Sequence, residues 1–150
     1  MTQVLTSSTP WDAAQQEGLQ QALALIPAPQ KEAYQYAHEQ NPRVVELESP
    51  PFLDVCQSNF WSAAERLVAY WDKRRDIFGK ERYFLPLTLS GNGALPLEAA
   101  KVIQKGAAVV IPQMDQYQRS VFLIDRAPVA NWQDSNNTRV KIVFYLLQVM

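Results

Sequence analysis

The longest regular pattern of apolar and polar positions in this sequence lies between Asn59 and Gly79. Apolar side chains recur there at the spacing of one helix face, and charged side chains largely fill the opposite side. Ser58 or Asn59 is suited to cap the start, and Gly79 lies where a left-handed residue commonly ends a helix. The pattern therefore predicts one long amphipathic helix. Its apolar face consists of Phe60, Ala64, Leu67, Trp71 and Phe78.

Shorter helical patterns precede and follow this stretch. One begins at Thr9-Pro10 and ends at Pro27, and a second runs from Lys31 to His38. The second ends before Asn41-Pro42, because a residue that precedes proline is disfavoured in the helical region. The other predicted helices are a short one opened by Ser49-Pro50-Pro51 and one from Leu97 to Gln104, with Gly106 just past its end.

After Gly106 the apolar spacing changes from helical to strand-like. The runs Ala107–Pro112 and Ser120–Asp125 are short, apolar and rich in β-branched residues, and the polar segment Gln113–Gln118 between them is suited to a hairpin loop. Because both runs are continuously apolar, we expect both faces of this hairpin to be covered. A sheet of two strands is marginal alone and needs helices or further strands around it.

A last helical pattern closes the sequence, and Asp134 or Ser135 is suited to cap it. No glycine, polar turn or terminal charge ends this pattern, so we expect the domain to continue beyond Met150. The predicted apolar stripe consists of Val140, Val143, Phe144, Leu147 and Met150.

Composition places these elements in a globular α+β domain. The chain has 150 residues and is 47% hydrophobic, enough for a sizeable core. Residues 1–65 hold eight acidic and two basic side chains, whereas residues 66–126 hold ten basic and six acidic ones. The net charge of −1 gives no reason to expect nucleic-acid binding.

Groups suited to catalysis or metal binding are sparse. His38 is the only histidine and has no second ligand at a suitable spacing, so we expect it to be structural. Cys56 is the only cysteine and lies among apolar neighbours, which favours an inert core thiol. The Gly91-Asn92-Gly93 turn lacks the preceding strand and following lysine of a phosphate-binding loop. We therefore expect no enzyme, no metal site and no cofactor.

The N-terminal and hydropathy patterns suggest a location. Met1 to Thr9 is polar, which does not fit a cleavable signal peptide. No apolar run approaches the roughly 20 residues that cross a bilayer. We expect a cytoplasmic protein, with peripheral membrane contact as an option.

Two stretches of this sequence resemble the CRAL-TRIO (phosphatidylinositol-transfer-protein-like) family over about residues 50–150. The family's helical N-terminal pattern is matched by Phe52-Leu53, Ala63-Ala64, Leu67, Tyr70-Trp71 and Arg74-Arg75. Its first hairpin is matched by Asp115, Arg119, Val121 and Ile124. The family usually has glycine before that arginine and proline after it, whereas this chain has Gln118 and Ser120.

The resemblance implies binding of a hydrophobic ligand, such as a phospholipid, tocopherol or retinoid, in a cavity lined by a sheet and closed by a mobile helix. It also implies a helical lobe over 49–105 and the incomplete start of a lipid-binding lobe over 106–150, which follow the acidic N-terminal helices that the charge and spacing predict over 1–48. The family's remaining strands, gate helix and headgroup-binding residues have no counterpart, so we expect a truncated CRAL-TRIO-like domain with a helical lobe, a β-hairpin and a C-terminal helix.

The candidate lipid-binding residues lie on the second strand and the last helix. Val121 and Leu123 point to one side of the strand, and Phe122 and Ile124 to the other, so one set faces ligand and the other the covering helices. Phe144 and Leu147 on the last helix complete the set. Core packing is the alternative role for each of these side chains.

A basic cluster supplies candidate membrane or headgroup contacts. A solvated helix face is one interpretation of this cluster; contact with an anionic membrane surface, worth about 1 kcal/mol per basic residue, is the other. Its interleaved acids argue against a nucleic-acid site. The cluster consists of Lys73, Arg74, Arg75, Lys80 and Arg82.

A second hypothesis is a protein-interaction or self-association module derived from a truncated lipid-binding domain. An unpaired strand edge and an apolar C-terminal helix both favour association with a partner or a second copy.

Overall fold

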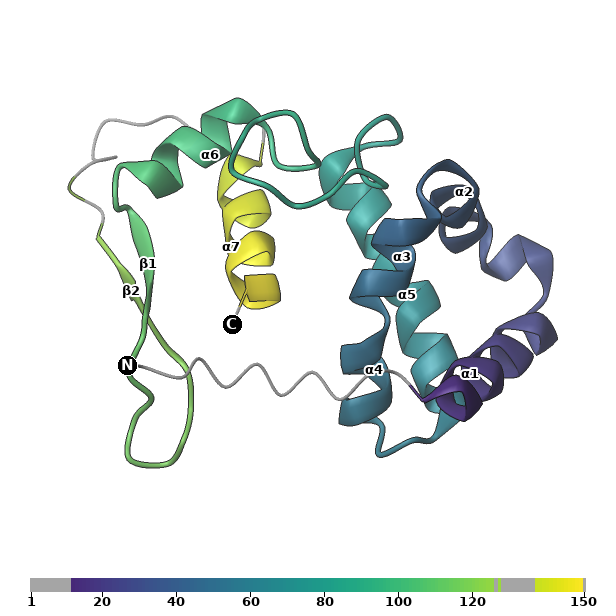
Figure 1. The fold of residues 1–150 in the computed structure, drawn as a ribbon. Helices are drawn as coiled ribbons and strands as arrows, with labels where there is room; N and C mark the ends of the chain where they lie inside the picture. The colour runs from purple at the N-terminus through teal and green to yellow at the C-terminus, as the bar shows by residue number, and fades with distance from the viewer. Residues whose placement is uncertain (1–11, 126, 128–136, 150) are drawn as a thin grey trace. The chain divides into compact units, whose positions relative to one another are not determined.

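The structure is a computed structural model that describes residues 12–125, 127 and 137–149. The described chain is mostly helical with one small antiparallel sheet, which confirms the α+β class. It divides into two compact units, unit 1 (Met1–Asp72) and unit 2 (Lys73–Met150), and the long helix α5 passes through the boundary (Figure 1). None of the described helices is both long enough and apolar enough to span a bilayer.

Unit 1 is built from helices. They are α1 (Ala13–Leu25), the 3-10 turn η1 (Ala28–Gln30), α2 (Glu32–Gln40), α3 (Pro42–Glu48), α4 (Pro50–Val55) and the first part of α5 (Phe60–Phe78). Asp12 caps α1 by accepting a hydrogen bond from the backbone N–H of Ala14 at 3.1 Å. The start predicted at Thr9-Pro10 lies outside the described residues.

Helix α3 was not predicted from the sequence. Asn41 does leave the helical region, with φ −150° and ψ 72°, so α2 ends there as expected. Pro42 then occupies the first position of a new helix, where its fixed φ and its missing N–H cost nothing. The same dipeptide therefore ends one helix and begins the next.

Both predicted ends of the long helix are confirmed. The Asn59 side chain caps α5, because its Oδ1 accepts a hydrogen bond from the backbone N–H of Ser62 at 3.0 Å. Gly79 follows the helix with φ +81°, the left-handed conformation that ends many helices.

Helix α1 approaches the start of α5 closely. A Cβ added at Gly18 would lie 2.6 Å from the Phe60 ring, so any larger residue there requires the ring to shift. The core of unit 1 lies beneath these helices and consists mainly of Leu19, Ala22, Leu23, Ala33, Ala37, Val45, Leu53, Ala63, Ala64 and Leu67.

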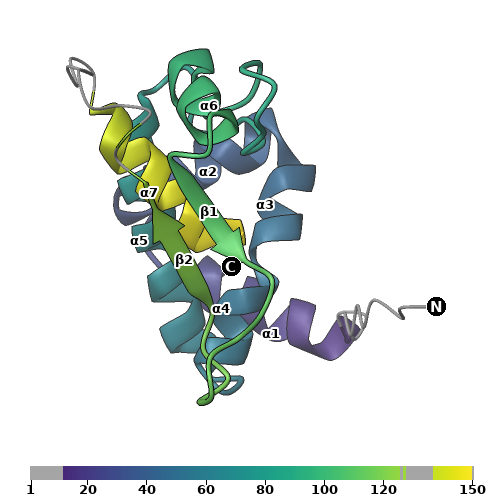
Figure 2. The ribbon, with the colours of Figure 1, turned by 90° about the vertical axis from the view of Figure 1, so that its left-hand side faces the viewer.

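Unit 2 contains the end of α5, helix α6 (Leu97–Gln104), strands β1 (Ala108–Ile111) and β2 (Val121–Ile124), and helix α7 (Thr138–Val149). The strands pair antiparallel, with Ala108 opposite Ile124 and Ile111 opposite Val121. Helix α6 packs against both α7 and β1, and α7 passes behind the two strands in Figure 2. The predicted hairpin and its approximate bounds are confirmed.

The predicted covering of both hairpin faces is wrong for the described structure. Phe122, Leu123 and Ile124 of β2 are 43%, 57% and 55% exposed. The cause is that α6 packs on β1 and buries Ala108, while β2 keeps its apolar side chains at the surface.

The predicted apolar stripe of α7 is also wrong in part. The helix buries Ile142 and Leu146, whereas Val140, Val143 and Leu147 are exposed. The error arises because α7 carries apolar residues on more than one face, so periodicity alone does not choose which face packs. Asp134, Ser135 and Met150 lie outside the described residues.

Candidate functional site

Exposed apolar side chains gather on the sheet and the last helix of unit 2. We call this set the apolar surface. It contains four side chains of the hairpin and three of α7 that are each at least 43% exposed. They are Val109, Phe122, Leu123, Ile124, Val140, Val143 and Leu147.

The strand pairing explains how the hairpin contributes to this surface. Val109 lies opposite Leu123, and Val110 lies opposite Phe122. Because side chains alternate across a strand, Leu123 and Val121 share one face while Phe122 and Ile124 share the other. The hairpin therefore presents apolar side chains on both of its faces.

Helix α7 contributes an open apolar depression of about 310 Å³ where it meets the end of α5. Phe144 forms part of its wall and packs edge-to-face on Phe78, with ring centroids 5.4 Å apart and an interplanar angle of 83°. Arg139 is the one charged residue among the described residues that line it. The full lining is Ile77, Arg139, Val140, Val143, Phe144 and Leu147.

The six predicted lipid-binding residues thus divide by exposure. Phe122, Leu123, Ile124 and Leu147 are exposed. Val121 and Phe144 are half-buried, and the contact of Phe144 with Phe78 gives it a packing role as well. Helix α6 packs against α7 and against β1, the strand that pairs with β2.

The basic cluster does not form one exposed patch. Arg74 is fully buried, and its Nη2 donates a hydrogen bond to the carbonyl oxygen of Leu85 at 2.5 Å. Its predicted role as a membrane or headgroup contact is therefore wrong, because the guanidinium serves the interior of unit 2. Lys73 and Lys80 are exposed and Arg75 is half-buried, and Lys73 lies 3.8 Å from Asp76 in an exposed ion pair.

Arg82 likewise has a structural role, because its guanidinium bonds backbone carbonyl oxygens. Its Nη2 donates hydrogen bonds to the carbonyl oxygens of Gly91, at 2.8 Å, and of Gly93. A Cβ at Gly93 would lie 2.0 Å from the carbonyl oxygen of Pro86, so this glycine permits the close approach. The predicted Gly91-Asn92-Gly93 turn therefore points the carbonyl groups of Gly91 and Gly93 toward the half-buried Arg82 side chain.

Hydrogen bonds to the Asp115 side chain hold the loop between the two strands. Asp115 accepts hydrogen bonds from the backbone N–H groups of Tyr117, at 2.8 Å, and Arg119, at 2.9 Å. The Arg119 guanidinium also bonds this carboxylate and holds the pKa of Asp115 below its ordinary value. Gln118 has φ +61°, a left-handed conformation that glycine adopts most easily.

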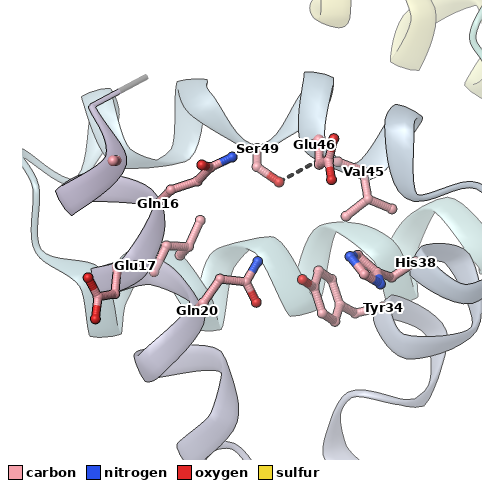
Figure 3. Close-up of a pocket in the computed structure, with 10 residues that line it drawn as sticks. Gln16, Glu17, Gln20, Tyr34, His38, Val45, Glu46 and Ser49 are labelled. Atoms are coloured by element: carbon pink, nitrogen blue, oxygen red, sulfur yellow. Dashed lines mark hydrogen bonds between the residues drawn. The ribbon is translucent and has the colours of Figure 1, made fainter. Parts of the chain in front are cut away.

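A partly enclosed pocket of about 380 Å³ lies between α1, α2 and α3 of unit 1 (Figure 3). Of its lining residues, only His38 is a candidate from the sequence, and the pocket itself is not predicted. The missed signal is helical spacing, because Tyr34 and His38 are four residues apart on α2 and Gln16 and Gln20 are four apart on α1. The lining is Ala13, Gln16, Glu17, Leu19, Gln20, Tyr34, His38, Val45, Glu46 and Ser49.

Aromatic and polar groups define the pocket wall. The Tyr34 and His38 rings stack with centroids 6.0 Å apart, and the Ser49 hydroxyl donates a hydrogen bond to the Val45 carbonyl oxygen at 2.6 Å. Burial raises the pKa of the Tyr34 hydroxyl, the negative charge of Glu46 raises it further, and a hydrogen bond with Gln20 opposes these effects. No group of three or more histidine, cysteine or acidic residues suited to a metal ion occurs in the described part of the chain.

Comparison with known proteins adds no assignment to either site. The chain matches no protein-family model, no curated protein and no solved structure.

Proposed function

We propose that this chain binds a hydrophobic lipid ligand as part of a CRAL-TRIO-like domain. The observation that carries the proposal is the apolar surface, on which exposed side chains of β2 and α7 occur in one unit. Removing apolar area from water is worth about 25 cal/mol per Å², and each buried CH₂ of an acyl chain about 0.8 kcal/mol. A lipid tail that covers the α7 depression or one face of the hairpin removes such area from water.

The hairpin loop supports the family resemblance on physical grounds. The family usually has glycine at the position that Gln118 occupies here, and Gln118 has a positive φ. A left-handed residue in that place is the backbone geometry that glycine favours. Asp115 and Arg119, the polar residues that match the family pattern, bond to each other across the same turn.

The resemblance and the geometry together suggest how a ligand is held. Val143 and Leu147 supply an exposed apolar strip on α7, and Phe144 is braced by Phe78 as a fixed wall of the depression. Lys73 and Lys80 remain exposed to contact an anionic membrane surface during transfer. We accordingly propose a cytoplasmic protein with peripheral membrane contact.

Lipid recovery from the purified protein tests this proposal. We expect organic extraction and mass spectrometry of the chain to recover a lipid in less than stoichiometric amount, because the apolar surface is open to solvent. The exposed-site variants Leu123→Gln and Leu147→Gln are expected to lower that amount. Leu25→Gln is the matched control, because Leu25 is a 73% exposed leucine on α1 of unit 1. Equal recovery from all of these proteins, or no lipid from the wild type, contradicts the proposal.

A second candidate function is self-association through the sheet. The two-stranded sheet of the described chain has apolar side chains on both faces, and strand edges without further pairing template the addition of another strand. Such a module recruits a second copy of this chain, or another protein, instead of a lipid.

Sedimentation equilibrium separates the two candidates. Self-association predicts a dimer whose fraction grows with protein concentration and falls in Leu123→Gln. Lipid binding alone predicts no such concentration dependence, and the lipid is recovered as above. A monomer without bound lipid argues against both.

A further inference from the structure

The pocket of unit 1 is independent of the apolar surface and has a different chemistry. Its volume of about 380 Å³ falls in the range of about 300–1,000 Å³ typical of small-molecule sites. Three helices contribute to its wall, so the site is held by the packing of α1, α2 and α3 instead of by one flexible loop.

The view in Figure 3 shows how the polar side chains are arranged. Gln16 and Ser49 lie on one side of the pocket, and Gln20 and Tyr34 point toward each other on the other side. The Glu17 carboxylate is turned away from the Tyr34 ring in this view. Glu46 on α3 is therefore the acidic group whose charge acts on the pocket, consistent with its effect on Tyr34.

The charge of the lining selects a class of ligand. Glu46 brings negative charge, and none of the described lining residues is lysine or arginine. An anion placed here meets a carboxylate without a guanidinium or ammonium partner, which disfavours binding. A cation is attracted by the same carboxylate and by the face of the Tyr34 ring.

The Tyr34 side chain is fixed before any ligand arrives. It is only 7% exposed, its ring stacks on His38, and its hydroxyl points toward the Gln20 side chain (Figure 3). A rigid aromatic wall reduces the conformational entropy lost on binding. Gln16 and Gln20 supply amide oxygens that accept hydrogen bonds from an ammonium group or from a ligand hydroxyl.

We propose that this pocket binds a small organic ammonium ion, held between the Tyr34 ring and the Glu46 carboxylate. The class follows from the size of the pocket, the aromatic wall and the sign of the nearby charge. The site lies within unit 1 and requires no contribution from the apolar surface.

Titration of the full chain with choline, followed by amide NMR, tests the proposal. We expect saturable shifts at Gln20, Tyr34, His38 and Glu46. The neutral isostere 3,3-dimethylbutan-1-ol at equal concentration is expected to give much smaller shifts, because it has the shape of choline without the charge. Equal shifts from the two compounds, or no shifts from choline, overturn the proposal.

Charge variants locate the site. Glu46→Gln removes the carboxylate and is expected to weaken choline binding about two- to fivefold, as for a partly exposed ion pair. Glu39→Gln is the matched control, because Glu39 is exposed on α2 and does not line the pocket. Amide spectra of both variants without choline establish that each is folded. An unchanged affinity in folded Glu46→Gln, or an equal loss in Glu39→Gln, contradicts the proposed site.

Discussion

The Arg119 guanidinium donates a hydrogen bond from Nε to Oδ2 of Asp115 at 2.7 Å, and its Nη2 lies 2.6 Å from the same oxygen in an ion pair. The other carboxylate oxygen accepts the backbone N–H groups of Tyr117 and Arg119. The Asp115 side chain therefore holds the turn between β1 and β2, because one of its oxygens bonds the backbone and the other pairs with Arg119. Charge-assisted bonds of this kind are stronger than neutral ones.

Acid should loosen this turn in a defined direction. Arg119 holds the folded-state pKa of Asp115 below its ordinary value of 3.8. The ion pair therefore contributes fully above pH 3.8 and is lost as the pH falls through the lower folded-state value. We expect the NMR titration midpoint of the Asp115 carboxyl to be lower in the folded chain than in urea. Equal midpoints in the two states contradict this account.

Replacing Gln118 by glycine should stabilise the hairpin. A left-handed conformation costs a residue with a Cβ roughly 1–2 kcal/mol, and glycine avoids most of that cost. Its greater freedom in the unfolded chain offsets part of the gain, so we expect an increase of up to about 1 kcal/mol in the free energy of unfolding. Urea denaturation measures the change, and Gln116→Gly is the control at a position without positive φ. Destabilisation by Gln118→Gly contradicts the left-handed geometry.

Gly93→Ala should disrupt the loop that precedes α6. The new methyl group would lie 2.0 Å from the Pro86 carbonyl oxygen, which is a backbone atom and cannot rotate away. We expect a loss of about 1–3 kcal/mol or more in the free energy of unfolding. Asn92→Ala, at the exposed neighbouring position, serves as the control and should change it by less than about 0.5 kcal/mol. Equal stability of the two variants would count against the close approach.

Substitutions of Arg74 and Lys80 should have different effects, because Arg74 is buried and Lys80 is exposed. Arg74→Met leaves the Leu85 carbonyl oxygen without its buried donor, so we expect a loss of about 1–3 kcal/mol in the free energy of unfolding. Lys80→Met should leave stability nearly unchanged and weaken sedimentation with vesicles containing phosphatidylserine. The reverse pattern, with a stable Arg74→Met and unaltered vesicle binding by Lys80→Met, contradicts both assignments.

Local signals in the sequence predicted most of the elements. The long helix was predictable because Asn59 and Gly79 mark its ends and its periodicity extends over 19 residues. The hairpin was predictable because two β-branched runs flank a polar connector. Helix α3 was missed because Pro42 was interpreted only as the end of the preceding helix, although proline is also favoured at a first helical position.

Tertiary packing was less predictable than the elements. Helix α7 is apolar on more than one face, so periodicity does not show that Ile142 and Leu146 are the residues that it buries. Arg74 was assigned to the surface because charged residues are mostly exposed, but the Leu85 carbonyl oxygen compensates its burial. Spacing shows that Gln16 and Gln20 share a face of α1 and that Tyr34 and His38 share a face of α2, but it does not show that these faces meet in a pocket.

Photocrosslinking measures lipid binding at the apolar surface most directly. A phosphatidylcholine with a photoreactive acyl chain is incubated with the full chain and irradiated, and the labelled peptides are mapped by mass spectrometry. We predict labelling concentrated in residues 121–124 and 139–148 and suppressed by excess unlabelled lipid. Labelling that is spread over unit 1, or that persists undiminished under competition, would contradict lipid binding by this surface.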